Sequence, residues 1–148
     1  MDFSLAQLSN ENLTILFNSA FYQAEEFTST DENGAVRSLG TMVHLNDWNH
    51  LIYADASDHY VSFETRTRVS DTEMSLMLKI CNFFDQFPVH ANAFKYGDGC
   101  TGVNFIYKHI VPEGTSISDR SLIGVFREFA KAVENHHAYW HQVKEHVA

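Results

Sequence analysis

The stretch "HYVSFETRTRV", residues 59–69, constrains the fold of this chain most, because its apolar and polar side chains alternate one by one. A strand with this period of two buries one face and exposes the other to water. Such strands are typical of antiparallel sheets that are covered on one side. The predicted buried face is Val61, Phe63, Thr65, Thr67 and Val69, and the predicted exposed face is Tyr60, Ser62, Glu64, Arg66 and Arg68.

Five other segments have the composition of strands and end at turn signals such as "DENG" and "GDGC". Short connections of this kind join antiparallel neighbours. Within the second segment, Gly40 is expected to mark a bulge or a close approach of another backbone. The tetrapeptide "NDWN" is expected to be a loop. The five segments are residues 21–30, 35–45, 50–57, 90–96 and 101–111.

Three segments place apolar side chains at helical spacing. The first follows Ser9, which can cap a helix, and the second begins near Ser70 and Asp71. The third begins at Ser118 and Asp119 and extends to about residue 146. Its apolar stripe is Leu122, Phe126, Phe129, Val133 and Trp140. The predicted order is α-β-β-β-β-α-β-β-α, an α+β fold with a single antiparallel sheet and helices packed on it.

At 148 residues and 45% hydrophobic composition, the chain is long enough for one domain with a substantial core. We expect a single domain over residues 1–148, with its core in about residues 8–135. Apolar stretches are too short to span a bilayer, and "MDFSLAQLSNENL" lacks the features of a signal peptide. The protein is therefore expected to be cytoplasmic, with Cys81 and Cys100 as free thiols.

Negative charge is concentrated at the beginning of the chain. The first 34 residues contain six acidic residues and no lysine or arginine, while the whole chain has a net charge of −9. Such a field repels phosphate backbones and anionic lipids, so neither nucleic acid nor membrane binding is expected. A partner with basic patches fits better, although the acidic face could also serve solubility alone. The six residues are Asp2, Glu11, Glu25, Glu26, Asp31 and Glu32.

Residues 76–111, "LMLKICNFFDQFPVHANAFKYGDGCTGVNFIYKHIV", carry a resemblance to a known family. An apolar helix has Asn82 near its end, a hairpin with Phe94 follows, and Asp98–Gly99 forms its turn. "NENLTILFNSAFYQAEEF" and "GTSISDRSLIGVFREFAKAV" continue the pattern on either side. Over about residues 8–135 the chain resembles the YbjN-like family, bacterial proteins proposed to regulate sensory transduction. Asp85 departs from the pattern, which often has a second asparagine there.

The resemblance implies a fold like that of type III secretion chaperones, in which helices pack against a small antiparallel sheet, usually in a dimer. Family members look like interaction modules rather than enzymes, and the resemblance supplies no catalytic residues. The amide of Asn82 has a simple expected role of its own. Near a helix end it can satisfy free backbone carbonyls or the neighbouring strand, with ligand contact as the alternative.

The stretch "ENHHAYWHQVKEH" contains four histidines in the predicted terminal helix. His137 and His141 lie one turn apart, beside Glu134 and Glu145, and this spacing can chelate Zn²⁺ or Ni²⁺ at a surface. A catalytic metal site needs a third ligand, which the sequence does not identify. Two interpretations stay open: a metal site made by His137 and His141, or a polar helix flank. His136 is expected to pack near the apolar stripe.

The other chemical signals in the sequence are weaker. His44, His50 and His59 flank two adjacent hairpin connections, where they could either cluster as a pH switch or lie singly, half-buried, in or beside strands. The sequence has no nucleophile elbow, no P-loop and no dinucleotide-binding glycine motif in the right context. We therefore predict neither catalytic residues nor a cofactor, and do not expect an enzyme.

Aromatic residues in the second half of the chain exceed what one small core readily buries. Excess apolar area is the usual mark of an oligomer or client interface, with a dense monomer core as the competing interpretation. The predicted function is a non-enzymatic protein-interaction module, a regulator or chaperone-like protein acting as a homodimer. The alternative is a metal-binding sensor or metal-dependent enzyme. The predicted interface residues are Phe83, Phe84, Phe87, Phe94, Phe105 and Tyr107.

Overall fold

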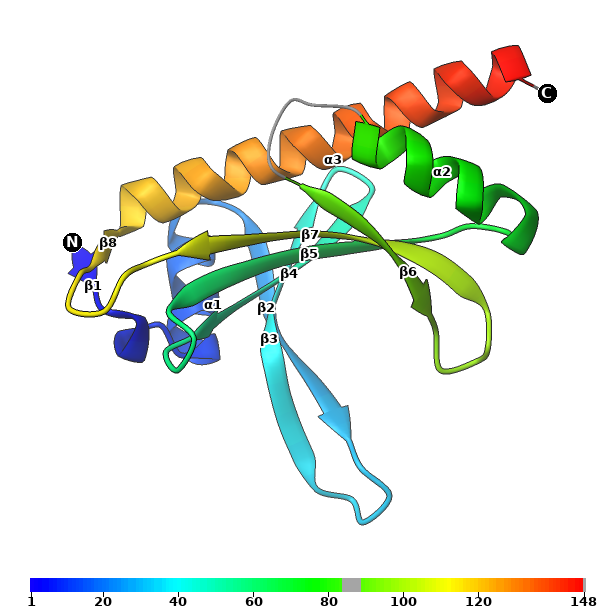
Figure 1. The fold of residues 1–148 in the computed structure, drawn as a ribbon. Coiled ribbons are helices and arrows are strands. Elements are labelled where there is room, and N and C mark those ends of the chain that lie inside the picture. The colour runs from blue at the N-terminus through cyan, green and yellow to red at the C-terminus, as the bar shows by residue number, and fades with distance from the viewer. Residues whose placement is uncertain (84–88, 148) are drawn as a thin grey trace. The chain divides into compact units, whose positions relative to one another are not determined.

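A computed structural model describes residues 1–83 and 89–147, with all side chains except those of Ile80, Cys81, Phe83, His146 and Val147 (Figure 1). The helices are α1 (Asn10–Ser19), α2 (Asp71–Phe83) and α3 (Asp119–Val147). The long strands are β2 (Gln23–Thr30), β3 (Val36–Leu45), β4 (Trp48–Asp55), β5 (Tyr60–Arg68), β6 (His90–Lys95) and β7 (Thr101–Ile110). Three short elements are β1 (Asp2–Phe3), the 3₁₀ helix η1 (Leu5–Gln7) and β8 (Ile117–Ser118).

The six long strands form one sheet in the order β2-β3-β4-β5-β7-β6, with antiparallel neighbours. This confirms the predicted α+β class and the predicted order of the long elements. Two of the three predicted caps are confirmed, whereas the hydroxyl of Ser70 before α2 bonds the hydroxyl of Thr72 instead of a backbone N–H. The hydroxyl oxygen of Ser9 accepts a hydrogen bond from the backbone N–H of Asn12 at 3.1 Å, and that of Ser118 accepts from the N–H of Ser121 at 3.0 Å.

The short elements were not predicted. β1 pairs with β8 through Asp2↔Ser118 and Phe3↔Ile117, so part of the segment expected to be a loop is paired with the N-terminus. A two-residue strand is too short to show alternation, which is the signal that identifies strands in sequence. The N-terminal ammonium lies 3.3 Å from a carboxylate oxygen of Asp119.

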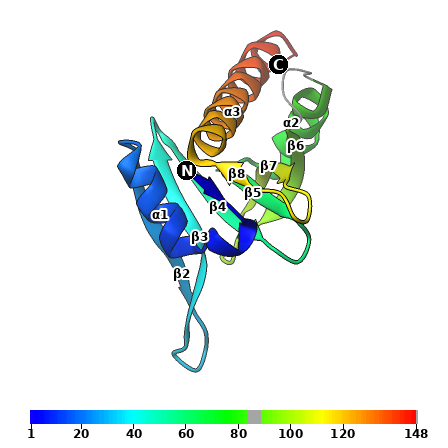
Figure 2. The same ribbon diagram turned by 90° about the vertical axis from the view of Figure 1, so that its left-hand side faces the viewer.

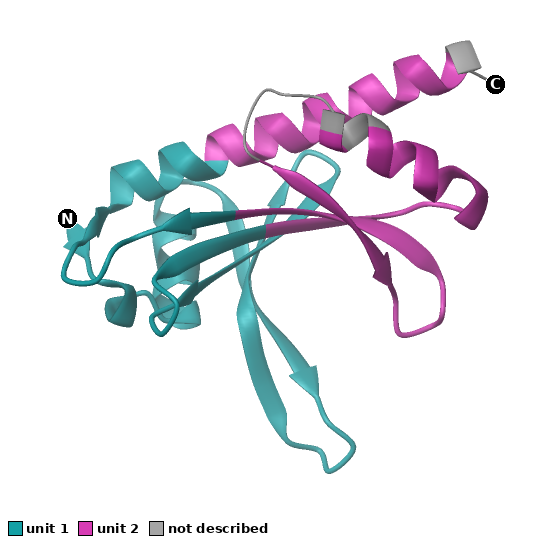
Figure 3. Ribbon diagram, viewed as in Figure 1, with its two compact units in different colours: residues 1–63, 108–126 teal, residues 64–107, 127–148 magenta. Residues whose placement is uncertain are grey.

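The described chain forms two compact units, coloured separately in Figure 3. Unit 1 contains residues 1–63 and 108–126, and unit 2 contains residues 64–107 and 127–148. The chain passes from one unit to the other inside β5, β7 and α3. That residues 1–148 form a single domain stays a prediction.

The core of unit 1 lies between α1, the first turns of α3 and the sheet. α1 contacts β2, β3 and β4, and Figure 2 shows it lying along these strands. The ring of Phe126 from α3 meets the rings of Phe17 and Tyr22 edge-on, with centroids 5.1 and 5.2 Å apart. Edge-to-face pairs of this kind add to the energy of apolar burial. The fully buried apolar residues of this core include Leu13, Phe17, Val43, Ile52, Val61, Phe63, Leu122 and Phe126.

In unit 2, α2 contacts β6, and the buried side chains come mainly from α2, α3 and the strands β5, β6 and β7. The stripe predicted for the last helix is confirmed along its length, because its first four residues are fully buried and Trp140 is nearly so. His136 is also fully buried, as expected, and its ring lies 6.2 Å from that of Phe105. The other buried residues of unit 2 include Met77, Ala91, Val103, Phe129 and Val133.

Two local predictions were wrong. Ser62 is fully buried although it belongs to the face of β5 predicted to be exposed. Tyr60, two residues earlier on the same face, is also half-buried, with the ring of Tyr53 6.5 Å away and Lys108 over its own ring. The expected loop "NDWN" is in fact a two-residue turn, because Asn46 adopts a positive φ of 54° that tolerates a tight hairpin.

Both expectations for Gly40 are confirmed. The register of β2 against β3 shifts between Phe27 and Thr28, since Phe27 pairs with Gly40 and Thr28 with Ser38. A Cβ atom at Gly40 would lie 2.7 Å from the carbonyl oxygen of Ile52. The position therefore admits only glycine without a shift of the backbone.

His50 should make the stability of the fold depend on pH. Its ring is packed 5.4 Å from that of Phe126, and burial lowers its pKa to about 4. The unfolded chain binds this proton below about pH 6.5 and the folded chain does not, so the free energy of unfolding should fall between about pH 6.5 and 4. The loss attributable to His50 is at most about 3 kcal/mol.

Urea unfolding across this pH range checks the expectation, with His50→Gln as the variant that lacks the titrating group. Subtracting the pH dependence of the variant from that of the wild type isolates the contribution of His50. Identical pH dependence in the two proteins would contradict the assignment.

Candidate protein-binding site

An asparagine from the preceding helix binds each outer strand of the sheet. The side-chain amide of Asn18 donates to the carbonyl oxygen of Ala24 in β2 at 3.0 Å, and its oxygen accepts from the N–H of Ala24 at 2.9 Å. Asn82 makes the same pair of bonds with Ala91 in β6, at 2.9 and 2.8 Å. Each asparagine is the second-last residue of its helix. Both edges are therefore closed at one position by the same device.

The structural role predicted for Asn82 is confirmed, since its amide satisfies the neighbouring strand. The equivalent role of Asn18 was missed. A signal for it was present in the sequence, because "NSAFYQAEEF" and "NFFDQFPVHANAF" both place an asparagine at a helix end shortly before an edge strand. Both stretches belong to the segments that carry the family resemblance.

Beyond Ala24, the outer edge of β2 is open in the described chain, because β2 is the terminal strand of the sheet. Backbone groups of a strand point alternately toward its two sides. Since the groups of Ala24 point away from β3 to Asn18, those of Glu26, Thr28 and Thr30 point the same way. We call these outward backbone groups the β2 edge.

The second half of β2 and the first part of β3 form a hairpin arm, which we define as residues 25–38. Every residue of the arm is exposed, and Figure 1 shows the arm extending beyond α1. The carboxylate of Asp31 orders its turn by accepting from the N–H groups of Asn33 and Ala35 at 2.8 and 2.9 Å. A two-stranded ribbon without a buried face gains little stability from packing, so the arm is a costly feature unless something else covers it.

Phe21 stands two residues before β2 in an unfavourable conformation. It has a φ of 68° and is 99% exposed. Phe21 follows the last turn of α1. The N–H of Phe21 donates to the carbonyl of Asn18, and the N–H of Tyr22 donates to the carbonyl of Phe17. Glycine is usual at this position of a helix end, because other residues are strained in the left-handed region. The aromatic ring is thus held in water at a cost to the backbone.

The arm carries four acidic residues against one basic residue, Arg37. Glu25 lies on the sheet face opposite α1, where a carboxylate oxygen is 2.9 Å from Nε2 of His44. Hydrogen bonds to Asn49 and Glu25 raise the pKa of His44. Glu26 pairs with Thr41 on the face toward α1, and the acidic residues of the arm therefore occupy both faces.

The predicted interface residues have different environments. Phe84 and Phe87 lie outside the described residues, as does the side chain of Phe83. Phe105 is fully buried, while Tyr107 and Phe94 are half-buried. The guanidinium of Arg66 lies 3.9 Å from the ring centroid of Phe94, which covers one face of that ring. The burial of Phe105 agrees with the interpretation of a dense monomer core. That the six predicted residues form an interface stays a prediction.

The terminal histidines lie as their spacing predicts. The rings of His137 and His141 are 4.4 Å apart at their centroids, and His137 has its pKa lowered by burial and by the charges of His141 and Lys144. Among the described residues, no three histidine, cysteine, aspartate or glutamate side chains come together as metal ligands would. A surface site made by these two histidines stays a prediction.

The strand histidines do not cluster. His44 pairs with Asn49 on the exposed face of the sheet, whereas His50 pairs with Val43 on the buried face. His59 lies at the far end of β4, because two successive hairpin connections leave opposite ends of the strand they share. The three rings therefore cannot act as one switch. Cys100 is an exposed free thiol, as expected, whereas the side chain of Cys81 lies outside the described residues.

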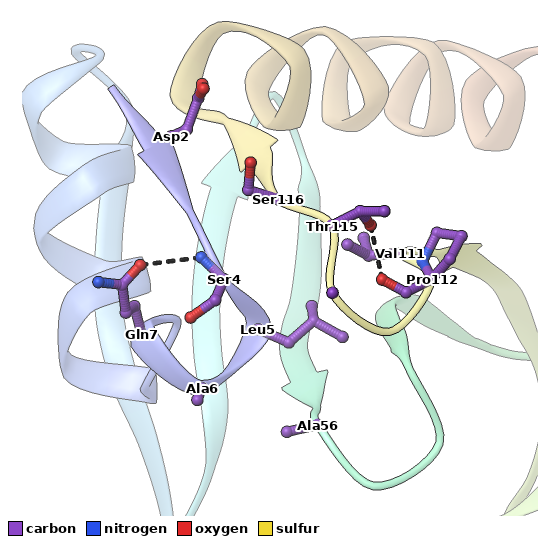
Figure 4. Close-up of a pocket in the computed structure, with 11 residues that line it drawn as sticks. Asp2, Ser4, Leu5, Ala6, Gln7, Ala56, Val111, Pro112, Thr115 and Ser116 are labelled. Atoms are coloured by element: carbon purple, nitrogen blue, oxygen red, sulfur yellow. Dashed lines mark hydrogen bonds between the residues drawn. The ribbon is translucent and has the colours of Figure 1, made fainter.

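A cavity of about 810 Å³ in unit 1 is lined by η1, the loop after β7 and their neighbours (Figure 4). Two hydrogen bonds join residues of its lining. The backbone N–H of Ser4 donates to the side chain of Gln7 at 2.9 Å, and the hydroxyl of Thr115 donates to the carbonyl of Pro112 at 2.6 Å. Asp2 is the one charged residue of the lining. This arrangement offers no acid–base pair for chemistry.

These observations define a class of protein, an α+β fold with a six-stranded antiparallel sheet, a separate two-stranded sheet and an exposed acidic edge. A solved structure has this fold. The crystal structure of YbjN from E. coli, a proposed transcription regulator, matches with a TM-score of 0.60 and 14% identity, covering 91% of this chain and 96% of that one. The likeness confirms the predicted YbjN-like fold. No family model and no curated protein matches the sequence. None of the described helices is long and apolar enough to cross a membrane.

Replacing Asn82 should destabilise the protein, because the N–H and carbonyl of Ala91 lose their partners. We expect Asn82→Ala to lower the free energy of unfolding by about 2 kcal/mol, as measured by urea unfolding. Asn82→Asp keeps the acceptor but loses the donor, and should have a smaller effect. Asn92→Ala, on the exposed side of β6, is the matched control. Equal losses for Asn82→Ala and Asn92→Ala would contradict the role given to the amide.

Proposed function

We propose that this protein is a non-enzymatic protein-binding module of the YbjN-like family, which acts in the cytoplasm as a homodimeric regulator or chaperone-like protein. The shared fold over nine-tenths of the chain supports this, because the matching structure is described as a proposed regulator and not as an enzyme. The cavity and the histidines offer no comparable support for catalysis.

The observation that carries the proposal is Phe21. An exposed apolar side chain alone needs no explanation, but an aromatic ring in a left-handed position usually taken by glycine is opposed by both solvation and backbone strain. Aromatic residues are enriched among the residues that dominate binding energy at interfaces. The exposed arm begins four residues further along the chain, so Phe21 and the arm both belong to unit 1 and flank the start of β2. We propose that a protein partner binds at this part of unit 1.

Phe21→Gly should separate binding from stability. Glycine relieves the left-handed strain, so we expect the free energy of unfolding to rise by about 1 kcal/mol. Capture of a partner from native cytosol, identified by mass spectrometry, should be lost at the same time. Ile110→Ser removes another exposed apolar side chain, 61% exposed in β7, and should leave capture unchanged. Undiminished capture by Phe21→Gly would contradict the proposal for this surface.

The proposed homodimer predicts the mass of the protein in solution. Light scattering coupled to size exclusion should give about twice the chain mass of 16.9 kDa at micromolar concentration. A mass of one chain that persists as the protein concentration is raised would contradict the dimer. It would leave the partner-binding part of the proposal intact, because capture is measured separately.

A further inference from the structure

We infer that the β2 edge binds a basic, extended segment of the partner protein as an added strand. This inference rests on the proposed function, since it names the chemistry of the partner at the same surface. The argument has three parts: the open backbone groups, the stop provided by Asn18, and the charge of the arm.

The open groups of the β2 edge suit strand addition. Glu26, Thr28 and Thr30 present their N–H and carbonyl groups outward along a strand that is already held in extended form by β3. A segment that pairs with them completes the ladder without rearranging the sheet. Main-chain bonds then provide affinity, and alternate side chains provide specificity.

Asn18 limits where the added strand can begin. Its amide already occupies both outward groups of Ala24, so pairing starts at Glu26 and runs toward the turn of the arm. The added strand can therefore pair with about five residues of β2. It also keeps the incoming strand clear of the end of α1.

Charge selects a basic occupant over a second copy of this chain. Two β2 strands placed side by side would bring Glu25 and Glu26 of both copies into one short ladder, and like charges in such a ladder destabilise it. Lysine or arginine side chains of a partner would instead meet Glu26 on the face toward α1. On the opposite face, an apolar side chain of the partner would meet Phe27, which is 37% exposed.

The first test measures the fluorescence anisotropy of a fluorescein-labelled peptide of about ten residues, in which lysine alternates with valine, on addition of the 148-residue chain. We expect binding that is lost when alternate peptide amides are N-methylated, because those groups supply the ladder. A peptide with glutamate in place of lysine should not bind. Equal binding by the N-methylated or the acidic peptide would overturn the inference.

Thr28→Pro removes an outward donor without touching the bonds to β3, since proline is tolerated on the open side of an edge strand. We expect binding of the lysine peptide to weaken roughly tenfold, whereas Thr28→Val should bind as the wild type does. Glu26→Lys should weaken binding more than Glu128→Lys, which makes the same charge change on the exposed side of α3. Equal effects of the two charge changes would mean unspecific attraction and would overturn the inference.

Amide hydrogen exchange supplies an independent readout. The lysine peptide should slow exchange at Glu26, Thr28 and Thr30 and leave Ser29 little changed, because the backbone groups of Ser29 already face β3. Protection elsewhere but not at these three amides would contradict strand addition.

The outcome for this inference can be separated from that for the proposed function. If Thr28→Pro captures the cytosolic partner as well as the wild type does, the proposed function stands and the inference fails. If neither protein captures a partner, the proposed function fails. If Thr28→Pro converts a dimer into a monomer, the occupant of the edge is a second copy, which would also overturn the inference.

Discussion

An antiparallel sheet leaves a row of unpaired backbone donors and acceptors along each outer strand. Much of this structure follows from which of these groups find a hydrogen-bond partner. At β6 and at β2, a helix ends one residue after an asparagine whose amide matches one backbone position of the strand. An amide side chain can do this because it carries a donor and an acceptor at the spacing of a peptide group. The two outer strands are thereby tied to the helices that precede them.

The remaining outward backbone groups of β2 have no such partner within the described chain. The charges of Glu25 and Glu26 instead oppose pairing of this edge with another copy. Natural proteins commonly place charged side chains on open edges to discourage pairing between copies. Here the charges have one sign, so they repel another copy but attract a segment of the opposite sign. The same residues that keep the edge soluble can therefore also choose its partner.

Much of the fold could be predicted from the sequence, because the alternation in β5 and the apolar stripe of α3 are long enough to be unambiguous. Ser118 and Asn82 were also predictable, since both follow local rules for helix ends. The burial of Ser62 was not, because alternation along one strand does not show how neighbouring strands cover a short side chain. Pairing of β1 with β8 joins the beginning of the chain to residues far along it, and two residues carry no periodic signal.

The proposed binding surface was harder to predict than the fold. Composition indicated an acidic first quarter of the chain, but only the sheet order shows that Glu25 and Glu26 lie on an outer strand. The conformation of Phe21 has no sequence signal, because aromatic residues are uncommon at that position of a helix end. The sequence alone was sufficient to reject the proposed cluster of strand histidines, since adjacent hairpin connections leave opposite ends of a shared strand.

The full exposure of residues 25–38 has a consequence for how such proteins can diverge. Two consecutive residues can be removed from, or added to, each strand of the ribbon. The ribbon then becomes shorter or longer while each remaining side chain keeps its face. A change by a single residue in each strand would invert those faces beyond it. Descendants of one ancestor could thus acquire ribbons of different reach in steps of two residues, and with them different recognition, while the buried half of the fold stays as it is.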